Sequence, residues 1–232
     1  MKKIILSFLL LLSTIGAIAQ ESRFTFGVSA GANYSFSSLG KIQGDNADDK
    51  GLPGFQAGLN VEYRLNRTFY LQSGLYFITK RMKFEYSLDA LGVSGRYDYT
   101  TKINPGYLQI PLRIALKTQL GTNSQLYFRG GVYFAYGVSG KYKSTDNLFL
   151  EGETSSTATY KESHFIYGDD YLERYDWGLS LGAGIEIKRY VVGLDLDLGL
   201  KNILKENHYF WPLTHDSKYK NRTLSLTAGY RF

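Results

Sequence analysis

An alternation of apolar with small or polar residues recurs eight times along this chain, and it restricts the fold more than any other feature. In the first instance Phe24, Phe26 and Val28 share one phase, while small or polar residues hold the other. A strict period of two indicates a β-strand with two unlike faces. Each instance is long enough to cross a bilayer as a tilted strand of about 9–11 residues. The instances occupy residues 23–36, 54–65, 69–77, 107–117, 126–138, 177–188, 192–200 and 222–232.

The connections between these segments alternate in length. Tight turns are expected at 65–68, 121–124 and 188–190, and long polar loops at about 37–53, 86–104, 141–172 and 203–219. Short turns at one end and long loops at the other, around an even number of strands, are typical of outer-membrane barrels. We therefore expect an all-β fold, an eight-stranded antiparallel transmembrane β-barrel. It would be an up-and-down meander with short periplasmic turns and long extracellular loops, spanning residues 20–232.

The first 19 residues resemble a secretory signal peptide. Lys2 and Lys3 precede a short apolar run, and Ala17 and Ala19 form an A-x-A cleavage site. A basic start, a short apolar core and such a site are the signature of export. We therefore expect residues 1–19 to be removed and the mature chain to reside in the cell outer membrane.

Composition excludes several other classes. The chain contains no cysteine, which excludes a disulfide framework and any thiolate metal site or nucleophile. Its net charge of +6 comes from scattered Lys and Arg, a pattern that does not favour nucleic-acid binding.

The same alternation would also suit a soluble eight-stranded barrel such as a lipocalin, with the apolar phase inside. Here the polar phase is mostly Gly, Ser, Thr and Asn, which would make a poor soluble surface. Aromatic residues such as Tyr34, Tyr63, Trp177 and Tyr190 gather near strand ends, where they suit a headgroup girdle. These features favour an apolar phase that faces lipid, so outer-membrane lipid and lipopolysaccharide are expected partners.

If the apolar phase meets lipid, the charged residues of the other phase point into the lumen. Eight strands leave an interior that side chains just fill, and charges there must be paired because desolvation costs several kcal/mol per ion. We therefore interpret Asp195 and Asp197 as partners of lumen arginines; a proton or metal site is the alternative. Interior glycines would leave space for long side chains. The expected salt-bridge lattice comprises Glu62, Arg64, Arg113, Arg129, Glu186, Asp195, Asp197 and Arg231.

Two further features concern strand ends and irregularities. Pro111 lies inside the segment 107–117 and cannot donate to a ladder, so a local bulge is expected there. The last segment ends with Tyr230 and Phe232 in phase, which resembles the targeting signal that the barrel-assembly machinery reads.

The chain shows no arrangement that demands catalysis, a metal or another cofactor. His164, His208 and His215 all fall in expected loops, without the i, i+4 spacing of a helical zinc pair. A lipid-A-modifying enzyme would need a nucleophile and base near the rim, for which Ser163 and His164 with Asp169 or Asp170 are the candidates. The aromatic stretch His208, Tyr209, Phe210 and Trp211 could enter the headgroup layer or dock a partner.

The stretches "YLQIPLRIALK", "LSLGAGIEIKRYVVGLDLDLGLKNI" and "NRTLSLTAGYRF" resemble the PorT-like outer-membrane β-barrel proteins of Bacteroidetes. The resemblance spans the mature chain and implies a barrel in the outer membrane. It also implies an association with protein secretion or envelope assembly, through an envelope or secretion protein as partner. Together these observations predict a structural or interaction role through the extracellular loops. A narrow channel or ligand carrier and a lipid-A-modifying enzyme are the alternatives.

Overall fold

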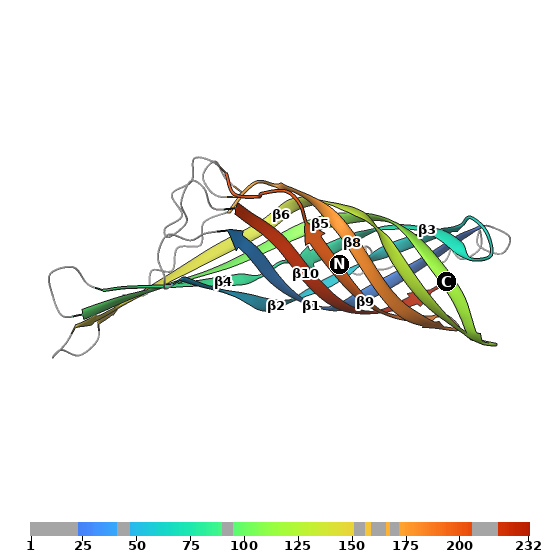
Figure 1. Cartoon of the computed structure of the whole chain (residues 1–232), viewed down its shortest axis with the longest axis horizontal. Helices are drawn as coiled ribbons and strands as arrows, with labels where there is room; N and C mark the ends of the chain where they lie inside the picture. Colours follow the sequence, from blue (N-terminus) through green and yellow to red (C-terminus); the bar gives the residue numbers. More distant parts are fainter. Residues whose placement is uncertain are drawn as a thin grey trace, which may run out of the picture.

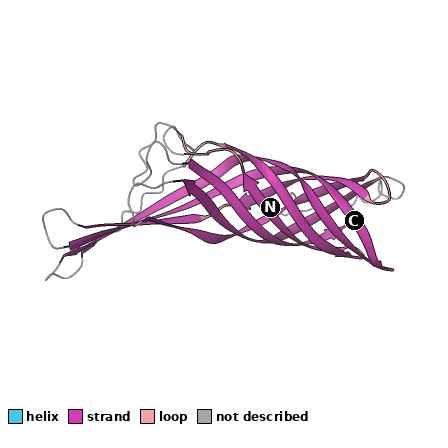
Figure 2. Ribbon diagram, in the orientation of Figure 1, coloured by secondary structure: helices cyan, strands magenta, loops and turns pink. Residues whose placement is uncertain are grey.

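The computed structural model describes residues 23–40, 47–89, 95–150, 156–158, 166–167, 172–205 and 218–232. Strands dominate these ranges (Figure 2), and none of the described residues forms a helix of the length and hydropathy that spanning a membrane requires. The strands are β1 (Phe24–Gly40), β2 (Ala47–Arg64), β3 (Phe69–Thr79), β4 (Met82–Asp89), β5 (Gly95–Gly121), β6 (Ser124–Leu150), β7 (Ser156–Ala158), β8 (Tyr175–Ile187), β9 (Tyr190–Gly199) and β10 (Lys218–Arg231).

Eight of these strands close into one ring (Figure 1). The ring runs β1–β2–β3–β5–β6–β8–β9–β10, every pair is antiparallel, and β10 pairs back with β1. The closing seam extends from Gly27 opposite Arg231 to Gly40 opposite Lys218. The predicted eight-stranded meander is therefore confirmed. Its tight connections, between β2 and β3, β5 and β6, and β8 and β9, lie where the sequence predicts them and define the short-turn end.

The outer face of the ring is apolar. On β5, Leu108 and Ile110 are 39% and 51% exposed, and on β9 Leu194 is 51% exposed. The alternate residues of β9 point inward: Asp195 and Asp197 are each 4% exposed. An apolar surface that continues around a closed barrel is stable in lipid rather than in water, so the alternation turns its polar phase to the lumen.

Pro111 causes no bulge, so that prediction is wrong. The register between β5 and β6 is continuous through Pro111 opposite Tyr133, and its shift near the long-strand end comes between Gly106 and Tyr107. Pro111 faces β3 with its carbonyl, which accepts a hydrogen bond from Ser73 Oγ at 2.8 Å. Its missing N–H therefore lies on the β3 side, where the pairing is interrupted for two residues while the register stays the same.

The long polar segments were expected to be loops, but much of them is strand. Beyond the ring, residues 47–51 of β2 pair with β4, β4 pairs with residues 96–103 of β5, and β5 continues beside β6 to Leu150. The short strand β7 adds to β6. We call these paired segments the projecting sheet; Figure 1 shows β4, β5 and β6 leading away from the barrel at the long-strand end. Apolar residues such as Met82 and Ile103 are fewer here and polar residues also enter their phase, so the alternation is a weaker signal than in the barrel wall.

A buried apolar cluster closes the barrel at the long-strand end. Ile166, Tyr167 and Leu172, from the β7–β8 connection, meet Ile203 and Leu204, from the β9–β10 connection. They pack on side chains at the inner ends of the ring strands and of β4. We call this cluster the apolar cap; it consists of Ile78, Met82, Phe84, Ile103, Tyr107, Tyr133, Ala135, Ile166, Tyr167, Leu172, Ile203, Leu204 and Tyr219.

Candidate functional site: the ionic lumen of the barrel

Near the short-turn end, four charged side chains form a closed ring of ion pairs, here called the ring tier. Lys117 Nζ lies 2.6 Å from Glu62 Oε1 and 2.9 Å from Glu186 Oε1. Arg231 completes the ring, with Nη2 2.5 Å from Glu62 Oε2 and Nη1 2.7 Å from Glu186 Oε2. The Lys117 ammonium also sits 4.3 Å from the ring centroid of Tyr70. Each cation therefore bridges both carboxylates, and four different strands are joined across the lumen.

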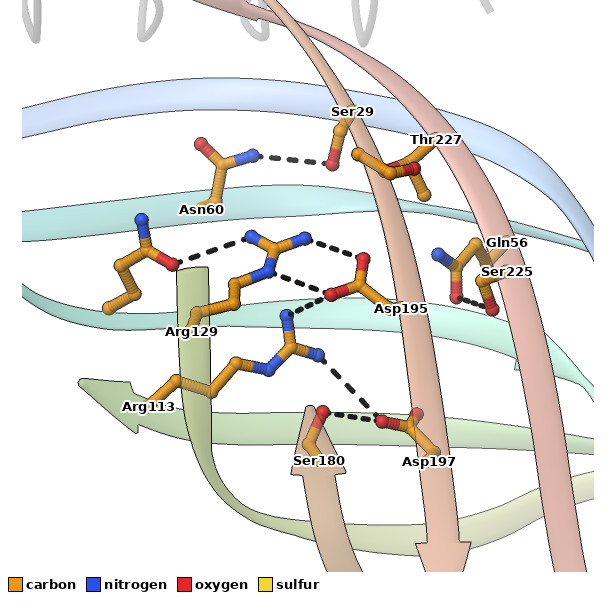
Figure 3. Close-up of polar contacts among 12 residues, drawn as sticks. Ser29, Gln56, Asn60, Arg113, Arg129, Ser180, Asp195, Asp197, Ser225 and Thr227 are labelled. Carbon is orange, nitrogen blue, oxygen red and sulfur yellow. Dashed lines mark hydrogen bonds and ion pairs between the residues drawn. The ribbon is translucent and has the colours of Figure 1, made fainter. Parts of the chain in front are cut away.

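Further into the barrel lies the middle tier, made of Arg113, Arg129, Asp195 and Asp197 (Figure 3). Arg129 donates from Nε to Asp195 Oδ1 at 2.7 Å and from Nη2 to Asp195 Oδ2 at 2.5 Å. Arg113 Nη1 lies 3.4 Å from Asp195 Oδ1, and its Nη2 lies 4.0 Å from Asp197 Oδ1. Two parallel bonds to one carboxylate make the Arg129–Asp195 pair the strongest contact type available to these groups.

Neutral donors complete the partners of Asp197. Ser180 Oγ lies 2.5 Å from its Oδ1, and Gln109 Nε2 donates to its Oδ2 at 2.7 Å. Every carboxylate oxygen of the middle tier therefore accepts at least one hydrogen bond from a neighbouring side chain. Carboxylates held by arginine and neutral donors in this way favour the ion-pair interpretation over a metal site.

A third charged pair lies beneath the apolar cap. Lys80 Nζ is 2.8 Å from Asp176 Oδ2, and both side chains are 0% exposed. Tyr133 and Asn221 donate to the same oxygen at 3.2 and 2.8 Å. The Lys80 ammonium also lies 4.5 Å from the Tyr133 ring centroid and 5.1 Å from that of Tyr107. We call Lys80 and Asp176 the buried pair; it is fully removed from water.

Each of these layers is electrically neutral. The ring tier has two cations and two anions, the middle tier has two of each, and the buried pair has one of each. Charge is thus compensated locally rather than across the length of the barrel. Compensation over a few ångströms is what a low-dielectric interior requires.

Little free space remains between the layers. A cavity of about 60 Å³ lies against the ring and middle tiers, beside Asn60, Gln72 and Tyr127, and is large enough to hold water. A wider open vestibule of about 370 Å³ occupies the short-turn end, and the ring tier forms its floor. The charged residues around the vestibule are Arg23, Glu62, Arg64, Lys117, Glu186, Lys188 and Arg231.

Interior glycines leave room for the larger lumen side chains. A Cβ added at Gly184 or Gly193 would collide with the hydroxyl of Tyr127, and one at Gly182 would collide with Asp195. The expectation that inward glycines make space for long side chains is confirmed at these positions. At these positions glycines leave the space that the side chains of Tyr127 and Asp195 fill.

Arg64 is one member of the expected lattice that the structure places elsewhere. It is the last residue of β2, its side chain is exposed, and it lines the vestibule without an ion pair to any described residue. Its assignment to the lattice is wrong because the strand ends there, two residues past Glu62, where the side chain reaches water. The structure brings the remaining seven residues of the expected lattice together in the ring and middle tiers.

The carboxyl-terminal aromatic residues lie on the outside of the short-turn end. Tyr230 packs against Phe232 and Tyr190, with ring centroids 5.7 and 5.5 Å apart. The backbone N–H of Phe232 donates to Phe26 O at 3.0 Å, which extends the β1–β10 seam. Recognition of these residues by the barrel-assembly machinery stays a prediction.

Several expected features fall outside the described residues. These are the signal peptide (1–19), the aromatic patch His208, Tyr209, Phe210 and Trp211, and the enzyme candidates Ser163, His164, Asp169 and Asp170. Within the described ranges, no group of three or more His, Cys, Asp or Glu side chains could hold a metal ion.

The expected lattice omitted two components of the lumen. The alternation of 107–117 predicts that Lys117, four residues after Arg113, points into the lumen; only its place in the ion-pair lattice is not predicted. Lys80 and Asp176 lie just outside the alternating segments 69–77 and 177–188, so the periodic pattern does not include them. Lys80 and Asp176 become neighbours only when the folded barrel brings the ends of these two segments together.

Fold and lumen together define a transmembrane β-barrel with a filled interior. The chain belongs to the family described as outer membrane protein beta-barrel domain, whose model matches residues 18–205. The protein is therefore an outer-membrane β-barrel. A comparison with curated proteins finds no match.

Solved structures with a similar fold include three outer-membrane proteins. Ail of Yersinia pestis, solved with the heparin analogue sucrose octasulfate, is 15% identical, with 90% of this chain and 99% of Ail covered and a TM-score of 0.36. OprG of Pseudomonas aeruginosa is 14% identical, with coverages of 90% and 95% and a TM-score of 0.42. Outer membrane protein W of E. coli is 14% identical, with coverages of 92% and 100% and a TM-score of 0.40.

Proposed function

We propose that this protein is a closed outer-membrane barrel that acts by presenting an interaction surface, with the projecting sheet on the outside of the cell. The observation that carries this proposal is the filling of the lumen by three neutral layers of ion pairs beneath an apolar cap. Because side-chain contacts fill the lumen, a partner or ligand would bind to the outer surfaces of the barrel rather than inside it.

The closed lumen argues against the narrow-channel alternative. A permeating ion would have to pass the Arg129–Asp195 pair and then the buried pair, whose side chains are 0% exposed. Opening a path would strand buried charges without partners, at a cost of about 3–5 kcal/mol for each broken pair. The vestibule gives water access from the short-turn end only as far as the ring tier and the small cavity behind it.

The projecting sheet supports the interaction role. It carries β2, β4, β5, β6 and β7 beyond the apolar belt, so backbone and side chains are presented well clear of the lipid. A sheet held rigidly by the barrel is better suited to binding than an unordered loop of the same length, because less conformational entropy is lost on binding. An envelope or secretion protein is the partner class that we propose, and the aromatic patch at residues 208–211 is a further candidate contact.

Conductance tests the closed lumen. The purified protein in planar bilayers should show no stable open level. A variant in which Arg113, Arg129, Asp195 and Asp197 are all alanine should also show none, because the ring tier, the buried pair and the apolar cap stay in place, provided that it retains heat-modifiable migration on gels. A stable open level in the parent protein would overturn the closed-barrel proposal.

Orientation has its own test, for which the absence of cysteine is an advantage. Thr100→Cys in the projecting sheet should react on intact cells with a membrane-impermeant maleimide, while Thr122→Cys in the β5–β6 turn should react only after lysis. The opposite pattern would put the projecting sheet in the periplasm and would refute the proposed surface role. Crosslinking from position 100 in cells, followed by identification of the captured protein, then tests for the partner.

A further inference from the structure

Four lysines lie side by side across four strands of the projecting sheet. The strand registers place Lys50 of β2 opposite Lys83 of β4, Lys83 opposite Lys102 of β5, and Lys102 opposite Lys143 of β6. Residues directly opposite each other point to the same side of a sheet. With strands about 4.8 Å apart, this lysine row spans roughly 14 Å. Lys141, two residues from Lys143 on β6, adds a fifth ammonium to the same face.

Glu85 is the carboxylate that neutralises part of this charge within the described ranges. Glu85 binds Lys50, with Nζ 2.7 Å from Oε2, and also contacts Lys83. These hydrogen bonds, from Lys50 first and then Lys83, lower the pKa of the Glu85 carboxyl below its usual value, so it stays ionised. Among the described residues, Lys102 and Lys143 have no carboxylate partner. Like charges directly opposite each other destabilise a sheet, so an anion bound to the row would stabilise it.

The lysine row faces outward over the membrane, not into the lumen. On β5, exposed and buried residues alternate without interruption from Thr101 to Ile103, and Lys102 and Asn104 share the phase of Leu108 and Ile110. The opposite face of the same strands carries Met82 and Ile103, which belong to the apolar cap. An anion that binds the row therefore approaches the outer face of the strands, from the side of the surrounding leaflet.

The height of the row selects among anionic lipids. Lys102 lies six residues beyond Leu108, the last large apolar residue of the outer face of β5 in that direction. Six residues of strand cover about 20 Å, or roughly 15 Å along the barrel axis at the usual tilt. The headgroup layer of a phospholipid leaflet is only about 5–8 Å thick. Phosphates at the level of the row must therefore be carried on a larger, saccharide headgroup.

We propose that the lysine row binds phosphate groups on the saccharide headgroup of lipopolysaccharide in the surrounding outer leaflet. The proposal rests on the orientation given under the proposed function, with the projecting sheet outside the cell. Lysine acts here as a point charge for phosphate rather than through a fixed bidentate geometry. A row of such charges suits a headgroup that bears several phosphates and can shift along the sheet.

Binding of a soluble probe tests this assignment. The mature protein in phosphatidylcholine nanodiscs is titrated with deacylated lipopolysaccharide, which is water-soluble and keeps its sugar phosphates. The variant K50Q/K83Q/K102Q/K143Q should bind about tenfold more weakly or worse, with a shallower salt dependence. The matched control R23Q/R64Q/R67Q/K188Q removes four exposed cations from the short-turn end and should bind like the parent. Both variants must show heat-modifiable migration.

Two further probes define what would overturn the assignment. Phosphatase-treated oligosaccharide should bind the parent as weakly as the untreated probe binds the lysine variant; equal binding with and without phosphate refutes the proposal. A sulfated glycan that binds more tightly than deacylated lipopolysaccharide would assign the row to a soluble polyanion instead and refute the lipid source. If Thr100→Cys is labelled on intact cells and the lysine variant still binds like the parent, the lysine row fails while the proposed function stands.

Discussion

Arg129 and Asp195 form a bidentate ion pair over Gly182, which lies between them in the barrel wall. The register sets Arg129 of β6 opposite Gly182 of β8, and Gly182 opposite Asp195 of β9. A side chain at Gly182 would collide with the Asp195 carboxylate. Two strands that are not neighbours can therefore exchange hydrogen bonds because the strand between them contributes no side chain at that level.

Asp195→Ala should lower the free energy of unfolding by about 3–5 kcal/mol, because it leaves Arg129 and Arg113 buried without their shared carboxylate. Asp197→Ala should cost less, since Arg113 keeps Asp195 and the other partners of Asp197 are neutral. Urea unfolding in lipid vesicles, followed by tryptophan fluorescence, gives both values. The partly exposed pair Glu173–Lys201 is the control, where Glu173→Ala should change stability by less than about 1 kcal/mol. Two aspartate variants as stable as the parent would contradict the ion-pair interpretation.

The ring tier should behave as one unit. Lys117→Met alone leaves each carboxylate with Arg231, and Arg231→Met alone leaves each with Lys117. The double variant leaves Glu62 and Glu186 facing each other without any cation. Its loss of unfolding free energy should therefore exceed the sum of the two single losses, by about 0.5–3 kcal/mol for coupled neighbours. A double-mutant cycle measures this excess, and additive losses would show that the two cations act independently.

Lys80 and Asp176 should tolerate joint replacement better than single replacement. Lys80→Met strands a buried carboxylate, and Asp176→Asn strands a buried ammonium, so each should cost about 3–5 kcal/mol. The double variant K80M/D176N keeps the shape of the site without either charge. It should recover most of the lost stability in the same urea assay. If K80M/D176N does not recover stability, the buried pair is in contact with water and its burial is contradicted.

Gly193→Ala should destabilise the barrel by about 1–3 kcal/mol through crowding, because the new methyl group meets the Tyr127 hydroxyl. Removing that oxygen with Tyr127→Phe should restore most of the stability in the Gly193→Ala background. Gly130→Ala is the matched control: its Cβ would lie 3.4 Å from Leu181 Cδ2, an ordinary contact, and little change is expected. If Tyr127→Phe gives no rescue, the space left by Gly193 serves another neighbour.

Alternation predicts most of the wall of this barrel, since a period of two states which side chains share a face. It therefore placed Asp195 and Asp197 inward and Leu194 outward, as the structure has them. It does not state which strand lies across the lumen at the same height, because that depends on strand tilt and stagger. Arg64 was assigned to the lattice for this reason, although its strand ends at the vestibule.

The projecting sheet was missed for a different physical reason. Beyond the apolar belt the alternation is short and uneven: Met82 and Phe84 alternate with Lys83, but Thr100 and Thr101 interrupt the pattern before Lys102. Their registers follow from the ring strands, which continue past the lipid because their neighbours are already paired. Local sequence cannot supply a pairing that is propagated from elsewhere in the sheet.

The ring tier draws Glu62 from β2 and Arg231 from β10, which lie on opposite sides of the β1–β10 seam. Before that seam forms, the open edge of the unfinished sheet leaves these charges solvated, and their mutual contacts cannot exist. Pairing of the first and last strands is thus the step that allows Arg231 to contact Glu62 across the lumen. The carboxyl-terminal strand is therefore the element that both closes the ring of strands and supplies the second cation to Glu62 and Glu186.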